Sequence, residues 1–500
     1  MRPHLPHKQV WQITVEAASP LSVTTGGHDG VDDTRLHVGP NGLPRLPATA
    51  LAGTLRKLLR AVEGVAAEGE GEEVSWPDQL FGWARGTRGA PSALEFSDAL
   101  LHGQHDLPIT ALRADLSDPL LLPLLTQAPA QRRQVRIGHQ GAAEPGAHFD
   151  RAVLPAGYRF SFDVTLHAAN AAACARHADM LLHLLSHRWH VGGRTRSGLG
   201  AVKVVALRTR RFDMTKPLDF QAYVALDHLG DPRPKLVPVM PAADTPPALP
   251  HTRTAQVRVK CVGALRIGGG TRVLQAGGSA DDKVADDLPY SEPTVTWSGP
   301  APGKQQGALA WRVVIPASAI KGALWHRVAF HDARAMLQAL DSGQPAATPA
   351  ATPATPLIAA VQALFGMAAE GEHGHAGAVR LSDLAFTQQQ LLGGHHLGPP
   401  DAHNSMDRLS GGGRSGALFS VQNLYHLPLH IDLHLDEGAL GRQAGSQERA
   451  AQVRQALAHT LDDLVEQRLP LGADGLGFVT GHWGWEPATP NTHSPVQEAP

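Results

Sequence analysis

The sequence predicts an α+β protein built from two tandem domains, and three observations support this prediction. Short alternating strands and amphipathic helices are mixed along the chain, which favours a sheet with helices packed on one face. The same series of segments occurs twice in the same order, and a proline-rich stretch separates the two series. Within each unit the order of strands and helices fits a ferredoxin-like, split βαβ arrangement.

The composition is that of an ordinary globular protein. The 500 residues are enough for two or three domains, and 42% of them are hydrophobic. The formal net charge of −2 argues weakly against nucleic-acid binding, although acids elsewhere can balance a local basic stripe. Aromatic residues make up only 5%, so aromatic contacts to bases would be sparse.

The number of cysteines and the lack of long apolar runs predict the cellular compartment of the protein. The two cysteines, Cys174 and Cys261, exclude a disulfide framework and a four-thiolate zinc site. The N-terminus lacks an apolar run of signal-peptide type, and no stretch approaches the roughly 20 apolar residues of a membrane span. We therefore expect a soluble, cytoplasmic protein.

Changes in composition predict the domain boundaries. We assign residues 1–230 to the first domain, 231–252 to the proline-rich linker and 253–486 to the second domain. A low-complexity loop is expected at 342–356, and residues 487–500 are expected to form a disordered tail.

The repeated segments indicate an internal duplication. Pro47 corresponds to Pro316, Phe149 to Phe419 and Gly200 to Gly477, at a nearly constant separation. Five segments match in order: a strand that runs into glycine (10–27 and 255–270), a proline-led helix start (46–60 and 315–329), Leu-Phe-Gly with an acidic strand end (80–99 and 364–384), a polar glycine segment with a strand (135–166 and 403–435), and a helix with a glycine loop (184–204 and 464–481).

The two proline-led helices show the clearest local patterns. Thr49 is a plausible N-cap of the first helix, and Ser318 takes the equivalent place in the second. Apolar residues follow at helical spacing and predict one buried face on each helix: Leu51, Leu55, Leu58, Leu59 and Val62 in the first, and Ile320, Leu324 and Val328 in the second.

Two glycine-rich segments carry a family resemblance. One runs from Met406 through Gly412 and is followed by Ala417-Leu418-Phe419, and the other is Gly192–Gly200. Together with the duplicated helix starts, they resemble the RAMP superfamily of CRISPR-associated proteins, and most closely the repeated backbone subunit of type III effector complexes. The resemblance covers nearly all of the chain outside the linker, the low-complexity loop and the tail. It implies an RNA-recognition-motif-like sheet with a β-hairpin thumb insertion in each half.

The sequence also departs from this family pattern. The thumb segment of the first half, Arg136–Gly141, lacks the Asp-Arg pair, and the last loop of the second half carries Asp474 in place of a basic triplet. The second half has extra residues between Gly270 and Pro316. We therefore expect the two halves to contribute unequally to RNA binding.

The resemblance implies a set of RNA-binding residues. Glycine loops and helix N-termini offer N–H groups to phosphate, and nearby basic side chains add charge-assisted donors. Alternatively, the loops are tight turns with solvated arginines and the helices are simply capped. The candidates are Thr49, Arg56, Lys57, Arg136, Gly192, Gly193, Arg194, Arg196, Ser197, Ser318, Lys321, Arg408, Gly411 and Gly412.

The resemblance also implies a catalytic aspartate in the loop after the first strand. In the first half Asp32 is the best match, with Asp33 as its neighbour. In the second half Asp287 precedes Leu-Pro and fits best, with Asp286 beside it and Asp281 and Asp282 earlier in the loop. Asp32 or Asp287 could hold a divalent ion, Mg²⁺ or Mn²⁺, or accept the proton of the attacking 2′-hydroxyl. Alternatively, these acidic loops are merely solvated.

The implied function is guide-RNA binding and metal-dependent cleavage of the paired target RNA. The expected partners are the guide RNA, the target RNA, other RAMP subunits and a large signalling subunit, with no membrane involved. Two alternatives remain at this point. One is a non-catalytic scaffold of the same complex, and the other is a guide-processing RAMP endoribonuclease that uses a histidine as acid or base.

Overall fold

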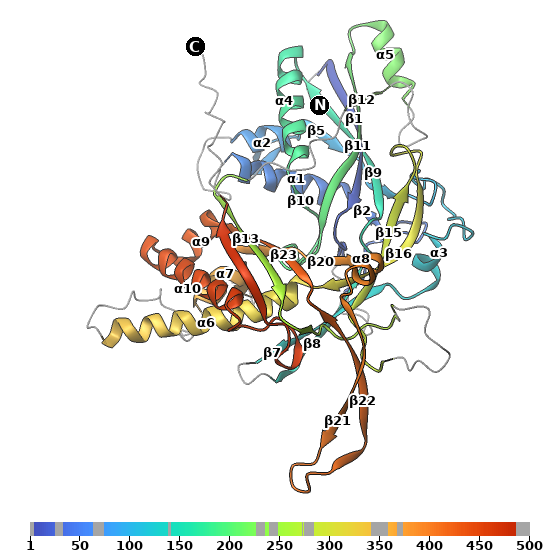
Figure 1. Cartoon of the computed structure of the whole chain (residues 1–500). Coiled ribbons are helices and arrows are strands. Elements are labelled where there is room, and N and C mark those ends of the chain that lie inside the picture. Colours follow the sequence, from blue (N-terminus) through green and yellow to red (C-terminus); the bar gives the residue numbers. More distant parts are fainter. Residues whose placement is uncertain are drawn as a thin grey trace.

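The structure is a computed structural model, and it describes residues 5–25, 34–63, 75–138, 142–226, 236–239, 249–272, 274, 285–341, 359–367 and 374–486. The low-complexity loop, the C-terminal tail and most of the linker lie outside these residues. The chain forms a mixed α/β structure with several antiparallel sheets (Figure 1). Below, the first half means the described residues up to 239, and the second half those from 249 onward.

An eight-stranded antiparallel sheet organises the first half. Its main path is β10-β11-β1-β9-β6-β2, while β12 pairs with β11 and β5 pairs with β9. The strands are β1 (His7–Ala17), β2 (Arg45–Leu46), β5 (Leu94–Phe96), β6 (Ala99–Leu101), β9 (Arg159–Ala168), β10 (Trp189–His190), β11 (Ala201–Asp213) and β12 (Val237–Val239). Strand β12 lies within the predicted linker, so this part of the linker extends the sheet of the first half.

Helices cover one face of this sheet because the strands alternate between apolar and polar residues. Trp11, Ile13 and Val15 of β1 and Phe160 and Phe162 of β9 are fully buried in the core. The helices of this half are α1 (Ala48–Val62), α2 (Trp76–Phe81), α3 (Leu122–Thr126), α4 (Ala171–Ser186) and α5 (Pro217–Val224).

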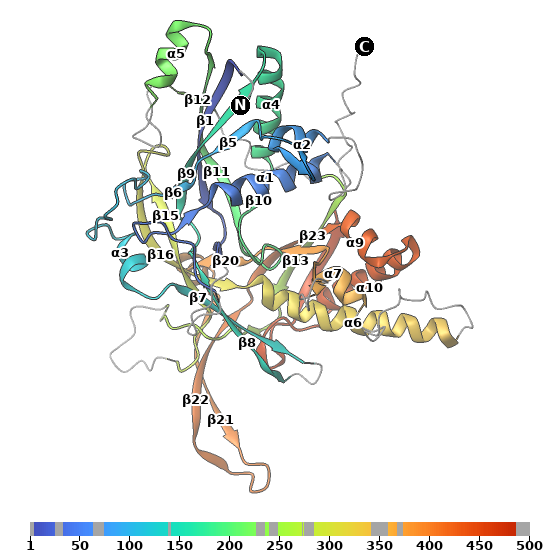
Figure 2. The same ribbon diagram turned by 180° about the vertical axis from the view of Figure 1, so that it is seen from behind.

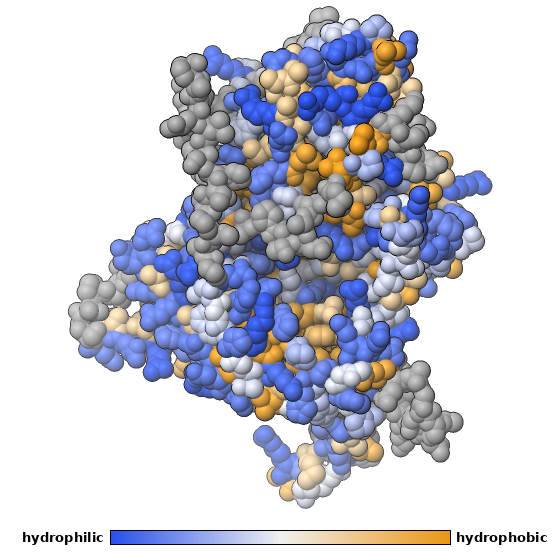
Figure 3. Space-filling view, turned by 45° about the horizontal axis from the view of Figure 1, so that its top comes forward, coloured by the Kyte–Doolittle hydropathy of each residue, from blue (hydrophilic) through white to orange (hydrophobic). Residues whose placement is uncertain are grey.

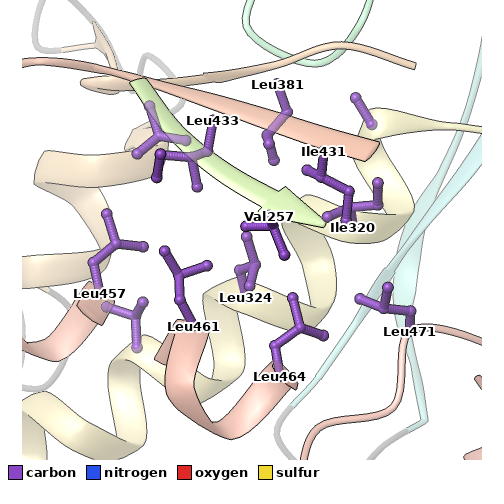
Figure 4. Close-up of a cluster of buried hydrophobic side chains, with 14 of the residues drawn as sticks. Val257, Ile320, Leu324, Leu381, Ile431, Leu433, Leu457, Leu461, Leu464 and Leu471 are labelled. Atoms are coloured by element: carbon purple, nitrogen blue, oxygen red, sulfur yellow. The ribbon is translucent and has the colours of Figure 1, made fainter. Parts of the chain in front are cut away.

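A four-stranded antiparallel sheet organises the second half, in the order β19-β23-β13-β24. Its strands are β13 (Thr252–Cys261), β19 (Val379–Leu381), β23 (Pro428–Asp436) and β24 (Val479–Trp485). The helices are α6 (Ala317–Asp341), α7 (Ala359–Phe365), α8 (Gln388–Gly393), α9 (Glu437–Ala444) and α10 (Gln447–Val465), with a 3₁₀ turn at Ala473–Gly475. Figure 4 shows strand residues such as Val257 and Ile431 packed against Leu324 of α6 and Leu461 of α10.

The two central sheets share one pairing order. In the first half the order is β5-β9-β1-β11, and in the second half it is β19-β23-β13-β24. The shared order follows the segments that the sequence pairs, since β1 and β13 open the two units and α1 and α6 follow them. The four strands therefore meet in the same way although their sequences differ.

Two long hairpins leave the sheets and are here called the thumbs. The first thumb is β7 (Ala130–Ile137) with β8 (Ala143–Val153), and the second is β21 (Leu397–Met406) with β22 (Gly413–Tyr425). The first thumb reaches α6 of the second half, where the carbonyl of Ile137 lies 3.2 Å from Nε2 of His326. The second thumb extends away from the rest of the molecule (Figures 1 and 2).

Part of the extra segment of the second half, residues 291–315, forms a hairpin that binds the first half. Strands β15 (Ser291–Ser298) and β16 (Gln306–Ile315) pair with each other, and β16 also pairs with β20 (Leu384–Thr387). Val295 donates a backbone hydrogen bond to Ala156, and the Trp297 indole donates one to Gly157. A side chain at Gly157 would come within 2.0 Å of the Val295 carbonyl, so this contact is close-packed. The hairpin therefore fastens the two halves together.

Short strands complete the fold. They form two small hairpins, β3 (Trp83–Arg85) with β4 (Arg88–Ala90) and β17 (Gly366–Met367) with β18 (His375–Ala376), while β14 (Ala264–Leu265) pairs with β22. The face of the molecule in Figure 3 is largely hydrophilic, with separate apolar patches. In the part of the chain that the structure describes, no helix is long and apolar enough to cross a membrane.

The helix starts differ from the prediction in how they are capped. Helix α1 begins at Ala48 after Pro47, so Thr49 lies inside the first turn and is not its N-cap. The carboxylate of Asp98 accepts the hydrogen bond of the Ala48 N–H at 2.8 Å, and Asp383 does the same for Ala317 of α6. An aspartate from the following strand end caps each helix, which local sequence cannot reveal. The predicted apolar faces are otherwise correct, except that Val62 is only half-buried.

Candidate nucleic-acid interface

The glycine loop at 192–200 connects β10 to β11 and needs its glycines. Gly192, Gly198 and Gly200 all have positive φ, which side-chain-bearing residues rarely adopt. A side chain at Gly192 would come within 2.4 Å of the Ser22 carbonyl, and one at Gly198 within 2.0 Å of the Asp383 carboxylate. The loop is therefore wedged between its own sheet and the second half.

Direct contacts place this loop on β19 of the second half. Ser197 forms a parallel bridge with Leu381, and the Arg196 guanidinium donates to the Ala378 carbonyl at 3.2 Å. Ser197 is buried in this contact, so its role is to dock the loop. The two arginines of the loop are thereby held at the junction between the halves.

Arg194 lies where the glycine loop meets the first thumb. Its φ is +56°, and its guanidinium lies over the Phe149 ring of the first thumb, 5.1 Å from the ring centroid. Partial removal from water and the charge of Arg136 both lower the pKa of Arg194. Arg136 itself is largely exposed on the thumb, 3.5 Å from Glu144. These two arginines thus lie along one path from the thumb to the glycine loop.

Three further cations lie close together at the junction between the halves: Arg196, Lys57 and Lys321. Partial burial lowers the pKa of Lys57, and the charges of Arg196 and Arg380 lower it further. Burial, together with Arg194 and Arg196, lowers the pKa of Lys321 to about 8. The Lys321 ammonium donates to the Phe365 carbonyl at 2.8 Å. Removal from water and nearby positive charge both favour the neutral form of a lysine, which is why its pKa falls here.

The acid beside these cations is Asp436. Its carboxylate lies 3.8 Å from the Arg196 guanidinium and also accepts the Ala439 N–H at the start of α9. We call Lys57, Arg194, Arg196 and Lys321 the junction cations. Two come from the glycine loop, one from α1 and one from α6, so both halves build the group. Such a concentration of positive charge is suited to holding phosphate groups.

Several predicted RNA-binding residues lie elsewhere. The Arg56 guanidinium lies 2.7 Å from the Asp78 carboxylate, and Arg60 also pairs with this carboxylate. Burial raises the pKa of Asp78, but the hydrogen bonds, from Arg56 first, bring it below its ordinary value. Arg56 therefore has a structural role inside the first half.

The remaining predicted residues are spread over the surface. Thr49 and Ser318 lie in the first turns of α1 and α6, and Gly193 donates its N–H to Ser22. Arg408, Gly411 and Gly412 lie at the exposed tip of the second thumb, where Asp407 accepts the N–H groups of Leu409 and Ser410. The structure does not bring this tip to the junction cations.

The predicted catalytic residues are placed only in the second half. Asp32, Asp33, Asp281 and Asp282 lie outside the described residues. Asp287 accepts the Gly269 N–H at 2.9 Å and lies 3.6 Å from the Arg266 guanidinium. Asp286 accepts hydrogen bonds from Ser420, which lower its pKa. The Asp286 carboxylate therefore faces the base of the second thumb, and the backbone of Asp287 bridges to Val421 there.

The residues that the structure describes do not form a ready-made metal-binding cluster. Within the described ranges, no group of three or more His, Cys, Asp or Glu side chains is placed to hold a metal ion. The carboxylate chemistry of Asp287 suits a divalent ion, but its oxygens are already engaged by Gly269 and Arg266.

Sequence reasoning missed two basic residues that stand outside the motifs taken to bind RNA. Arg380 in β19 depresses the pKa of Lys57, and Arg132 of the first thumb is buried between Glu292 and Asp383 of the second half. Neither stands in a glycine loop or at a helix start. Only the docking of one half on the other brings them to the junction.

A family model matches part of this chain. No curated protein matches this chain. The sequence model of the RAMP superfamily matches residues 14–203, which run from β1 through the glycine loop into β11. The matched residues thus include Lys57, Arg194 and Arg196, and the match supports a CRISPR-associated RAMP protein.

Proposed function

We propose that this chain is a double-length backbone subunit of a type III CRISPR effector complex that binds guide RNA. In this proposal each half is an RNA-recognition-motif-like domain with its own thumb, and the proline-rich linker joins them. The guide RNA, the target RNA, other RAMP subunits and a large signalling subunit are the partners, in the cytoplasm. Pairing between guide and target supplies sequence selectivity, while the protein holds backbone and shape.

One observation carries the proposal. The junction cations come from both halves, and the glycine loop that supplies two of them is locked in place by Ser197 and Gly198. Burial lowers the pKa values of Lys57, Arg196 and Lys321, and neighbouring cations lower those of the two lysines further. The charge of Asp436 offsets this only in part at Lys57 and Arg196. A polyanion that follows the junction would supply the missing negative charge.

The test replaces the two loop arginines together. We expect Arg194→Ala with Arg196→Ala to weaken binding of a short single-stranded RNA to the full chain. The logarithmic salt slope should flatten by about 0.7 for each lost phosphate contact, as measured by fluorescence anisotropy. Wild-type protein purified with its complex should also carry a small RNA. An unchanged slope, or a native complex free of nucleic acid, would contradict the proposal.

Cleavage of the target RNA is the catalytic part of the proposal. Asp32 and Asp287 would act in the loops after the first strands, with Mg²⁺ or Mn²⁺ as the divalent ion. A non-catalytic scaffold is the second candidate, and one observation favours it for the second half. The Asp287 carboxylate already binds Gly269 and Arg266, which is how a purely structural aspartate holds a loop.

A further inference from the structure

A second group of basic side chains lies beyond the glycine loop, where burial lowers the pKa of His190 of β10 and the nearby charges of Arg380 and His434 lower it further. Arg188 precedes β10 in the first half, while Arg380 in β19 and His434 in β23 belong to the second half. Arg380 and His434 are paired across the two strands, so their side chains emerge on the same face of the sheet. The opposite face carries the buried residues Val379 and Leu433.

Burial and the charges of neighbouring groups both lower the pKa values of Arg380 and His434. Burial, followed by Arg196 and Arg188, lowers the pKa of Arg380 to about 10. Burial, followed by Arg380 and Arg188, lowers the pKa of His434 to about 4. Arg196 is one of the junction cations, so the second group continues the first.

The acids nearby are already engaged. Asp432, beside His434 in β23, forms an ion pair with Arg258 at 2.8 Å. Asp436 lies against Arg196 and caps α9. The positive charges of Arg188 and Arg380 are therefore left without a carboxylate of their own in this part of the described structure.

Two polar atoms of this group are buried without a hydrogen bond. They are Nε of Arg380 and Nε2 of His434, which have no partner among the described residues. The other ring nitrogen of His434, Nδ1, lies 3.0 Å from the Thr254 hydroxyl. When Nδ1 accepts from this hydroxyl, the neutral ring carries its proton on Nε2 and offers it as a donor. Buried donors beside two guanidinium groups are the chemistry that binds an oxyanion.

We propose that Arg188, Arg380 and His434 form a phosphate-binding site, and that an RNA strand held at the glycine loop continues over it onto the second half. This inference rests on the proposed function and extends the bound strand past the residues that the motifs mark. The arginines supply the charge, and the neutral histidine supplies a directed hydrogen bond. The ligand is a phosphate group, either a diester of the RNA backbone or free inorganic phosphate.

The first experiment measures binding of a short single-stranded RNA to the full chain. Arg188→Gln and Arg380→Gln are compared with Arg334→Gln, an exposed arginine on α6 well away from the junction. We expect each of the first two changes to weaken binding severalfold and to lower the salt slope by about 0.7, with no effect of the control. Because Arg188 is exposed, its replacement leaves folding intact even where that of Arg380 does not.

The outcome separates this inference from the proposed function. One outcome is that RNA binding is lost in the double variant Arg194→Ala with Arg196→Ala but is unchanged in Arg188→Gln and Arg380→Gln. The bound RNA would then end at the glycine loop, which overturns this inference and leaves the proposed function standing. No effect of any of these changes would overturn both.

The second experiment distinguishes the two sources of phosphate. Thermal unfolding of the full chain is followed in sodium phosphate and in sodium chloride at equal ionic strength and pH. One outcome is that phosphate raises the unfolding midpoint saturably, and that Arg380→Gln abolishes this rise but does not affect RNA binding. That outcome would assign the site to free phosphate and overturn the proposal that the RNA strand continues over it. An effect on RNA binding, with or without such a rise, supports it.

Discussion

Lys321 lies in the second turn of α6, close to Arg194 and Arg196 of the glycine loop. These two cations and partial burial lower its pKa to about 8, and its ammonium donates to the Phe365 carbonyl. The lysine is therefore mostly charged at pH 7 and mostly neutral at pH 9. A phosphate bound beside it would favour the charged form and raise its pKa.

We therefore predict that RNA binding weakens as the pH rises from 7 to 9. Lys321→Arg should remove most of this dependence because an arginine stays charged over the whole range. Lys321→Met should bind weakly at both pH values, and Lys216→Met, at the residue before α5, serves as the matched control. The measurement is the dissociation constant for a short single-stranded RNA across this range at constant salt. A pH dependence that persists in Lys321→Arg would assign it to another group.

The residues of the junction differ in how far the sequence could reveal them. Arg194, Arg196 and Lys321 stand in repeated motifs, and the structure brings them together. Arg56 stands in the same helix pattern but pairs with Asp78 of α2, and the sequence gives no signal for that pairing. Arg188 and Arg380 are far apart in sequence, so no local signal connects them.

At the scale of elements, the first thumb is fastened to the second half by one buried arginine. Arg132 donates to both oxygens of Glu292, at 2.6 and 2.8 Å, and to Asp383 at 2.7 Å. Burial raises the pKa of Asp383 even though the charge of Arg132 opposes this. Asp383 also caps α6, so the thumb, the helix and the strand end meet at one carboxylate.

We predict that Arg132→Met destabilises the protein by about 3–5 kcal/mol, because it leaves two buried carboxylates without their cation. The matched control is Arg133→Met on the same strand, since Arg133 is exposed and lies 3.8 Å from Asp150. The control should change the free energy of unfolding by no more than about 0.5 kcal/mol. Denaturant unfolding measures both variants. Equal losses in the two would show that the buried pair contributes no more than the surface pair.

The elements themselves were largely predictable, whereas their connections were not. The apolar spacing correctly predicts buried Leu51 and Leu55 on α1 and Ile320 and Leu324 on α6. The caps were wrongly predicted because Asp98 and Asp383 come from strands that lie far along the chain. The extra residues before Pro316 had no assigned structure, and they form the hairpin that binds the first half.

At the scale of the whole molecule, two units of the same strand order play unequal parts. The family match ends at residue 203, and the second half carries the β15–β16 hairpin that binds the first half. The first thumb is docked on the second half, while the second thumb extends freely (Figure 2). The sequence predicts the duplication because patterns repeat along the chain. It also predicts that the halves differ, but not which thumb is docked, because that docking arises from contacts between the units.

The last prediction concerns cleavage by the two halves. In its complex, the wild-type protein should cut target RNA at two positions a fixed distance apart. Asp32→Ala should abolish one break and Asp287→Ala the other, and EDTA should stop both if a divalent ion takes part. RNA binding should survive both changes because neither residue supplies positive charge. Gel analysis of end-labelled target RNA reads out both positions.

The Asp287 variants are the more informative part of this experiment, because the structure shows which groups bind the Asp287 carboxylate. Because Gly269 and Arg266 hold the carboxylate, Asp287→Asn retains the shape of the loop while removing the charge. Loss of one break in both Asp287→Asn and Asp287→Ala assigns a catalytic role to the charge. Loss on Asp286→Ala instead would place the catalytic acid one residue earlier, at the carboxylate that Ser420 now binds. Two intact breaks in every second-half variant would make that half a scaffold, and no break in the wild type under any of these conditions would make the whole chain one.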